Sequence, residues 1–502
     1  MVLVLVSIFL IRAAEQWAVV HQAMLLSNSY LCLGEDFFQR IKPSPAIKPK
    51  LFLWNATLAT ELGLTEALFD DEVARAQLFS GNELFPNSTP IALAYAGHQF
   101  GHFNPQLGDG RAHLLGEVKG CDLQLKGSGR TRFSRGGDGR CALGPAIREF
   151  IMSEAMHALG VPSSRALAVV TTGEQVIRDR PVPGAVVTRV ASSHLRVGSF
   201  EYFYAQNKLE QLNKLCDFAI ERHFPQLKVF EGPERYLAFL DGVFKAQVNL
   251  IVEWMRVGFI HGVMNTDNCS IAGETIDYGP CAMMNSYNPN TVYSSIDQNG
   301  RYSFGNQAGI AQWNMARLAE CFLPLIDSDE KSAQQKAMPL LTEFAQHYHS
   351  QHTQMLAKKV GLRAADGEDE KLLNVLLASM RRHHLDYTQT FDQLSDSLLH
   401  EPHERVDEHI EPWYSQWRQR LDAEQRPLSE IAEEMRKHNP RLIPRNHHVE
   451  AVLQECIDSG SAQAAEPFLA VLRKPYELMA NTPHYQDSPE DGDRYYQTFC
   501  GT

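Results

Sequence analysis

The chain of 502 residues contains no Cys-x-x-Cys pair, no internal repeat and no low-complexity tract. The missing Cys-x-x-Cys spacing argues against a zinc ribbon and against a thioredoxin-type redox motif. The nine cysteines are scattered along the chain, and their number is odd. This usage predicts reduced thiols in a cytosolic protein and not a disulfide framework.

The sequence is also poor in positive charge and in long apolar runs. Its net charge of −13 gives no general case for binding nucleic acid or an anionic membrane, so a site for polyanions must be a local basic cluster. No segment reaches the roughly 18 apolar residues of a membrane-spanning helix, and we expect no membrane partner. The apolar residues 1–12 lack a basic start and a clear cleavage site. We expect 1–24 to be an extension, with mitochondrial or membrane targeting as the alternative.

What is present is an ordinary globular composition, with 44% hydrophobic and 21% charged residues. The length allows about two to four domains, or one large two-lobed unit with additions. Such a chain can bury a sizeable core without stabilisation by disulfides or bound metals.

The sequence pattern changes near residue 205, from β-like runs to helical spacing of the apolar residues. Before it, Gly- and Arg-rich sequence contains four short β-like runs: Ala112–Val118, Asp122–Lys126, Ala166–Thr171 and Ala185–Val190. A helix is predicted between Pro145 and Gly160.

After residue 205, apolar residues recur at helical spacing over 209–219, 237–255 and 310–322. More helices are expected over 330–470, with breaks near 366–369 and 440–444, and the last 25 residues are expected on the surface. The pattern predicts an α+β protein with a β-rich lobe, a helical lobe and a cleft between them.

Lys126 ends one of the predicted strands, where its ammonium group could reach the phosphates of a nucleotide. Glu149, on the following helix, is the expected ion-pair partner, and Glu154 is its competitor. A single lysine of this kind is more often a solvated edge residue. The Gly-rich turn before it and the Glu-bearing helix after it favour the nucleotide site.

Two Gly- and Arg-containing segments flank this strand. In 107–111, Leu-Gly-Asp-Gly-Arg, glycines would let backbone N–H groups approach phosphate oxygens, although such a segment alone is more often a hairpin turn. Segment 129–140 is rich in both residue types and also suits phosphate. Arg189 and Arg196 follow later and could add positive charge.

The loop that starts at His261 is the most informative stretch. With Asp277-Tyr278-Gly279 it looks like the catalytic loop and the metal-binding turn of a protein kinase. Asn268 and Asp277 offer hard oxygen ligands for Mg²⁺ or Mn²⁺. The position of the kinase base is Val263, which cannot accept a proton. Asp267 is the only carboxylate in the loop, which predicts a base for a reaction other than ordinary γ-phosphoryl transfer.

Together these segments resemble the selenoprotein O family, kinase-fold proteins that act as protein adenylyltransferases. The resemblance extends from about Ser27 to the C-terminus and leaves 1–24 outside. Its motifs are 95–101 (Tyr-Ala-Gly-His-Gln-Phe-Gly), 106–111, the Lys126 strand, 137–140, 193–196, 261–268, 277–281, 306–307 and 313–320.

The resemblance implies that AMP passes from ATP to Ser, Thr or Tyr hydroxyls of other proteins, and that pyrophosphate leaves. ATP would bind in a flipped orientation, with its α-phosphate toward the acceptor. Asp267 would be the base, and Asn268 and Asp277 would hold Mg²⁺ or Mn²⁺. The implied nucleotide contacts are Gly108, Gly110, Arg111, Lys126, Asp138, Gly139, Arg189 and Arg196.

Two other functions stay open at this point: a kinase-like γ-phosphotransferase that uses Asp267, and an inactive nucleotide-binding scaffold. UTP as a donor, which would make the enzyme also a uridylyltransferase, is open as well.

The resemblance also implies an organisation. It places a nucleotide-binding N-lobe at 25–200, a C-lobe core with the catalytic and metal loops at 201–330, and a helical extension with a redox tail at 331–502.

Cys500 stands where other members carry selenocysteine, and Cys281 would be its partner in a regulatory disulfide. This substitution favours a bacterial cytoplasmic protein. Met283 and Asn285 depart from the Phe and Asp that are usual in the family.

Overall fold

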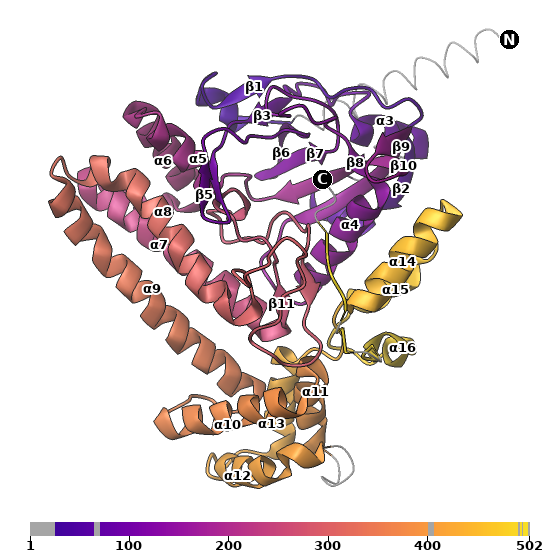
Figure 1. The fold of residues 1–502 in the computed structure, drawn as a ribbon, viewed down its shortest axis with the longest axis vertical. Helices are drawn as coiled ribbons and strands as arrows, with labels where there is room; N and C mark the ends of the chain where they lie inside the picture. Colours follow the sequence, from indigo (N-terminus) through magenta and orange to yellow (C-terminus); the bar gives the residue numbers. More distant parts are fainter. Residues whose placement is uncertain (1–25, 65–70, 400–405, 490–491, 494, 500–502) are drawn as a thin grey trace, which may run out of the picture.

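The computed structural model describes residues 26–64, 71–399, 406–489, 492–493 and 495–499. A sheet-rich first part is followed by a helical second part, which confirms the α+β class (Figure 1). The predicted extension 1–24 and Cys500 lie outside the described residues. Within the described part, no helix is both long and apolar enough to cross a membrane.

The first part is built on an antiparallel eight-stranded sheet in the order β1-β3-β6-β7-β10-β9-β2, with β8 beside β10. In this order the strands are β1 (Phe38–Arg40), β3 (Ile91–Leu93), β6 (Ala112–Val118), β7 (Cys121–Lys126), β10 (Pro181–Ala191), β9 (Arg165–Ile177), β2 (Lys50–Trp54) and β8 (Cys141–Ala142). Two small antiparallel pairs lie outside it: β4 (Gly97–Gln99) with β5 (His102–Asn104), and β11 (Phe259–Ile260) with β12 (Ala282–Met283).

All four strands predicted from the sequence are present, but β9 and β10 are longer than expected. They form one hairpin in which pairing continues outward to Pro181 and Ile177. The outer residues mix polar and turn-forming side chains with apolar ones, and they stay extended because each strand supplies the other's backbone partners.

The sheet has a separate apolar layer on each face. Leu123 and Leu125 of β7 belong to a core with the helices α2 (Ala56–Glu61) and α3 (Glu72–Ser80). Ile147 and Phe150 of α4 (Leu143–Ala158) belong to the larger core, and α4 packs against β9 and β10. Helix α4 is buried on nearly all sides, so its charged residues are buried as well.

The second part is mainly helical, and a long connection, 258–306, carries β11, β12 and the loop that begins at His261. The helices that follow β10 are α5 (Val197–Ala205), α6 (Leu209–His223), α7 (Gly232–Val257), α8 (Gln307–Ile326), α9 (Glu330–Lys359), α10 (Gly367–His383), α11 (Tyr387–Ser397), α12 (Glu411–Asp422), α13 (Leu428–His438), α14 (Asn446–Ser459), α15 (Ala465–Leu472) and α16 (Thr482–Gln486). Helices α7, α8 and α9 pack on one another, and α14 and α15 return to pack against α4 (Figure 1).

The prediction that the last 25 residues lie on the surface is wrong for four of them: Thr482, Tyr485, Asp493 and Thr498 are buried. Asp493 accepts hydrogen bonds from Asn285 and Asn446. A polar segment can be buried where each polar group finds a partner, and local composition does not reveal those partners.

Candidate functional site

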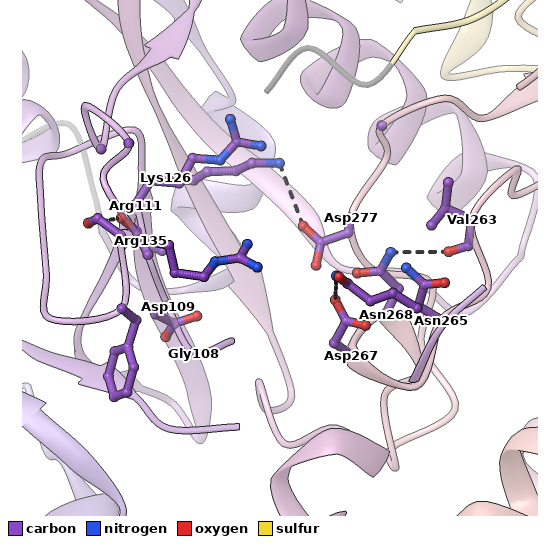
Figure 2. A pocket seen from close by; sticks show the side chains of 18 of the residues that line it. Gly108, Asp109, Arg111, Lys126, Arg135, Val263, Asn265, Asp267, Asn268 and Asp277 are labelled. Atoms are coloured by element: carbon purple, nitrogen blue, oxygen red, sulfur yellow. Dashed lines mark hydrogen bonds and ion pairs between the residues drawn. The ribbon is translucent and has the colours of Figure 1, made fainter. Parts of the chain in front are cut away.

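A cavity of about 870 Å³ lies where the sheet faces the loop that begins at His261. Its sheet side comprises the turn 108–111, Lys126 and the segment 133–140, and its other side comprises 263–268 and 277–280. Figure 2 shows the two groups facing each other across the space, with Lys126 and Arg135 directed toward it. Every predicted nucleotide, base and metal residue lines this cavity.

The floor of the cavity is a network of alternating charges. Lys126 Nζ donates to Glu149 Oε2 at 2.7 Å and lies 3.6 Å from Asp277 Oδ1. Arg189, from β10, donates to both of these carboxylates. Arg196 donates to Asp277 Oδ2 at 2.8 Å and to the Asp267 carbonyl oxygen at 2.6 Å. Three cations therefore surround one carboxylate, that of Asp277.

These charges control the carboxylates of the network. Burial would raise the pKa of Asp277, but Arg189, Arg196 and Lys126 hold this pKa well below its ordinary value. Burial acts in the same direction on Glu149, where Arg189 and Lys126 lower the pKa to about 2. Both side chains are consequently anions at neutral pH.

Glu154, the competitor for Lys126, has a different partner. It receives two hydrogen bonds from Arg165, each of 2.9 Å. The structure thus brings Lys126 together with Glu149 and not with Glu154.

The loop is set in place by His261, which follows β11. Its Nε2 donates to the carbonyl oxygen of Ile276 at 2.9 Å, and its backbone N–H donates to Gln307 Oε1 at 3.0 Å. Burial lowers the pKa of His261, so the ring is neutral. His261 therefore links the loop to the residue before Asp277, which is a structural task.

Asp267 has two unlike carboxylate oxygens. Oδ2 accepts a hydrogen bond from Gln99 Nε2 at 3.2 Å, whereas Oδ1 is buried and has no hydrogen-bond partner among the described residues. Burial raises the pKa of Asp267 to about 6, although the charge of Arg196 lowers it. A buried acceptor without a partner is costly unless a ligand or proton donor supplies one.

The residues expected to hold a metal fit that role in their chemistry. Asn268 donates from Nδ2 to the Val263 carbonyl oxygen at 3.1 Å, which leaves its Oδ1 as an acceptor near Asp277 (Figure 2). An amide oxygen and a carboxylate suit Mg²⁺ or Mn²⁺, which take few protein ligands when phosphates supply others. No group of three or more His, Cys, Asp or Glu residues that could hold a metal by itself occurs in the described ranges.

The glycines of the sheet side permit close packing of one segment on another. At Gly108, with φ of +69°, a Cβ would lie 2.3 Å from the Phe133 ring, and at Gly139, with φ of +71°, it would lie 2.2 Å from the backbone of Gly129. Gly110 is restricted by the Phe133 carbonyl oxygen. The turn and the basic segment could not close on each other with larger residues.

Two side chains of the segment 129–140 form contacts with other parts of the protein. Arg140 donates to Glu174 and to the carbonyl oxygens of Ser44 and Pro45. Asp138 accepts from Arg178 at 2.8 Å. Asp138 thus lies within an ion pair at the rim of the cavity.

Three polar side chains that build the site were not predicted from the sequence as site residues: Gln99, Asn265 and Tyr95. Besides Gln99, Asn265 Oδ1 accepts from the Phe100 backbone and from Tyr302, and Arg196 stacks on the Tyr95 ring with 4.6 Å to its centre. Tyr95, Gln99 and Phe100 belong to the motif 95–101 of the family resemblance, and this motif was the one indication in the sequence that they belong to the site. Its contact with the loop that begins at His261 spans more than 160 residues, so no local pattern indicated its task.

Of the predicted redox pair, only Cys281 can be placed. Its side chain is buried, and burial raises the pKa of its thiol to about 11. Its predicted partner, Cys500, is outside the described residues.

The geometry defines a class of site: an acidic loop opposite a cationic, Gly-rich wall suits an enzyme that handles a nucleotide polyphosphate. Comparison with known proteins then gives the family. The family model described as "Protein adenylyltransferase SelO" matches residues 22–473. The chain belongs to this family of nucleotidyltransferase enzymes, which confirms the resemblance drawn from the sequence.

Curated relatives support the same assignment over nearly the whole chain. A protein of Teredinibacter turnerae is 59% identical over 485 residues, covering 95% of this chain and all of the relative. One of Pseudoalteromonas translucida is 50% identical, again over 95% of this chain and 100% of the relative. One of Anoxybacillus flavithermus is 49% identical over 95% and 98%, respectively. Each is named protein nucleotidyltransferase YdiU.

Proposed function

We propose that this protein transfers AMP from ATP to Ser, Thr or Tyr hydroxyls of other proteins and releases pyrophosphate. The observation that carries the proposal is that Asp267, whose pKa burial raises to about 6, lines the same cavity as Lys126, Arg189 and Arg196. Membership of the adenylyltransferase family supports AMP as the transferred group.

The proposed architecture is a protein-kinase-like two-lobed fold. Residues 25–200 would form the nucleotide-binding lobe, 201–330 the lobe with the catalytic and metal loops, and 331–502 a helical extension with a redox tail. The cavity between the sheet and the His261 loop would then be the interlobe cleft.

In the proposed complex, the cationic wall holds the polyphosphate of ATP. Lys126, Arg189 and Arg196 would exchange part of their contacts with Glu149 and Asp277 for contacts with phosphate oxygens. They would also stabilise the charge that builds up on the departing pyrophosphate. The other residues assigned to the nucleotide are Gly108, Gly110, Arg111, Asp138 and Gly139.

Asn268 and Asp277 would hold Mg²⁺ or Mn²⁺, which supplies positive charge to the phosphates when bound. Asp267 accepts the proton of the acceptor hydroxyl on its carboxylate. The hydroxyl oxygen bonds to the α-phosphorus, the bond from this phosphorus to the bridging oxygen breaks, and the electron pair leaves with pyrophosphate.

The remaining proposals concern context. The partners are proteins with accessible hydroxyls, nucleic acid is not a partner, and the bacterial cytoplasm is the proposed location. A disulfide between Cys281 and Cys500 would regulate the enzyme. Mass spectrometry of the oxidised protein that finds both thiols free would rule this disulfide out.

Isotope position tests the reaction. The protein is incubated with a protein acceptor and ATP labelled on either the α- or the γ-phosphate. Label on protein from α-labelled ATP alone is expected. Transfer from the γ position would establish the kinase-like alternative, and no transfer from either would leave a nucleotide-binding scaffold. Asp277→Ala is expected to abolish transfer.

A further inference from the structure

The residue before Glu149 connects α4 to the C-terminal part of the chain. Arg148 is only 8% exposed and reaches three separate segments. Its guanidinium donates to Glu450 Oε1 of α14 at 2.6 Å, to the Cys281 carbonyl oxygen at 2.7 Å and to the Tyr496 hydroxyl at 3.2 Å. One side chain thus joins the helix of the Lys126 partner to the loop that follows Asp277.

The segment with Tyr496 is itself fastened to that loop. Thr498 donates from its backbone N–H to Tyr293 at 2.8 Å and from Oγ1 to the Pro280 carbonyl oxygen at 2.7 Å. The Tyr496 hydroxyl also donates to Glu450 at 2.9 Å. Arg148, Glu450 and Tyr496 consequently form a closed polar triangle, which we call the α4 clamp.

A second cavity, of about 450 Å³, lies between α4 and the segment 496–499. Lys126 and Glu149 line it, as do Arg148, Glu450 and Tyr496. Close apolar packing therefore does not fill the space between α4 and the segment 496–499. The polar contacts of the α4 clamp join the two across it. Arg148 would transmit a displacement of the segment 496–499 to α4.

We propose that Arg148 is a positioning residue, through which the docked C-terminal segment holds Glu149 in register with Lys126. Glu149 orients the ammonium group of Lys126, because Nζ donates to Glu149 Oε2 at 2.7 Å. When the α4 clamp opens, α4 shifts, the ion pair loosens, and the cleft binds polyphosphate less well. This inference rests on the proposed function, in which Lys126 contacts the phosphates.

The chain offers a matched control for this idea on the same helix. Glu154 of α4 is held by Arg165, and Arg165 also contacts Glu61, whose side chain is 51% exposed. Glu450 is 49% exposed and contacts Arg148 at the same distance of 2.6 Å. Glu450→Gln and Glu61→Gln therefore remove equivalent carboxylates from two arginines that anchor α4.

The experiment measures equilibrium binding of a fluorescent, non-hydrolysable ATP analogue to the full chain, together with thermal unfolding. Tyr496→Phe and Glu450→Gln are expected to weaken binding about fivefold, the size of the ordinary net contribution of one hydrogen bond. Glu61→Gln is expected to leave the affinity unchanged. Both effects should disappear in the Glu149→Gln background, because Arg148 acts through that residue.

Equal losses in Glu450→Gln and Glu61→Gln would overturn the proposal, since any anchor of α4 would then suffice. So would unchanged affinity in Tyr496→Phe and Glu450→Gln, or full additivity with Glu149→Gln. Failure of the proposed function is a separate result: the unaltered protein would transfer no label from α-labelled ATP, while the binding comparison could still be read.

Discussion

The side-chain amide of Gln99 donates a hydrogen bond to Oδ2 of Asp267 across 168 residues of sequence. The other oxygen, Oδ1, is buried against the β4–β5 hairpin and has no hydrogen-bond partner among the described residues. The hairpin thus fixes the orientation of the proposed base. Gly97 of the same strand makes the approach possible, because a Cβ there would lie 2.7 Å from Oδ1.

Gln99→Leu should lower the turnover of AMP transfer about tenfold, because the carboxylate loses its fixed orientation. The KM for ATP should change little, since Gln99 has no proposed contact with the nucleotide. Steady-state transfer from α-labelled ATP measures both quantities. His102→Ala, an exposed position on the same hairpin, is the control, and an equal loss there would indicate damage to the hairpin as a whole.

Asp277→Asn should separate nucleotide binding from turnover. Arg189 and Arg196 lose an anionic partner and become more available to phosphate, so ATP should bind at least as tightly without metal. Transfer should fall by a factor of about a hundred or more, because a proposed metal ligand loses its charge. Removing divalent ions from the unaltered protein with a chelator should produce the same loss of transfer. Transfer that persists under both conditions would contradict the metal assignment.

Gly198→Ala should destabilise the protein by at least about 2 kcal/mol through overpacking. A Cβ at Gly198 would lie 2.1 Å from the Ala96 carbonyl oxygen and 3.5 Å from the Asp267 backbone. Chemical denaturation measures the difference in the free energy of unfolding. Gly367→Ala is the comparison, because a Cβ there meets no atom within 4 Å; a similar loss in both variants would refute the steric argument.

Stability should depend on pH through Asp122, which is fully buried on β7. Burial would raise its pKa, but the hydrogen bond with His194 and the charge of Arg222 lower it below the ordinary value. A lowered folded-state pKa means that this contribution is complete above the unfolded pKa of about 3.9 and is lost as the pH falls through the folded value.

Asp122→Asn should therefore cost about 3 kcal/mol near neutral pH, since the largely buried Arg222 loses its shorter ion pair and keeps only the longer one with Glu117. The difference from the unaltered protein should shrink below about pH 4. Urea denaturation at several pH values measures it. A difference that does not change with pH would show that charge is not the cause.

Local sequence was enough to predict the strand that carries Lys126 and the helix that carries Glu149, because each has a clear period and clear ends. It also brought Asp267, Asn268 and Asp277 together, since they are close in the chain and fall in a motif of fixed spacing. Lys126, Asp267, Asn268 and Asp277 all line one cavity.

Sequence could not predict that Gln99 orients the carboxylate of Asp267, or that Arg148 joins four segments. Such features depend on partners from distant elements, as in the contacts from Arg148 to Glu450 and Tyr496. The burial of Asp493 and Thr498 was missed for the same reason. A polar residue looks like a surface residue until its long-range partners are known.

The cations around Asp277 affect how the site binds ATP and a divalent ion. Without ligands, Lys126, Arg189 and Arg196 are each already paired with Glu149 or Asp277, and the Asp277 side chain is only 20% exposed. ATP alone can recruit Arg189 and Arg196 only by leaving that carboxylate without compensation. A divalent ion that arrives with the nucleotide removes this cost. Donor and metal should therefore bind synergistically, and linkage requires each to raise the affinity for the other by the same factor.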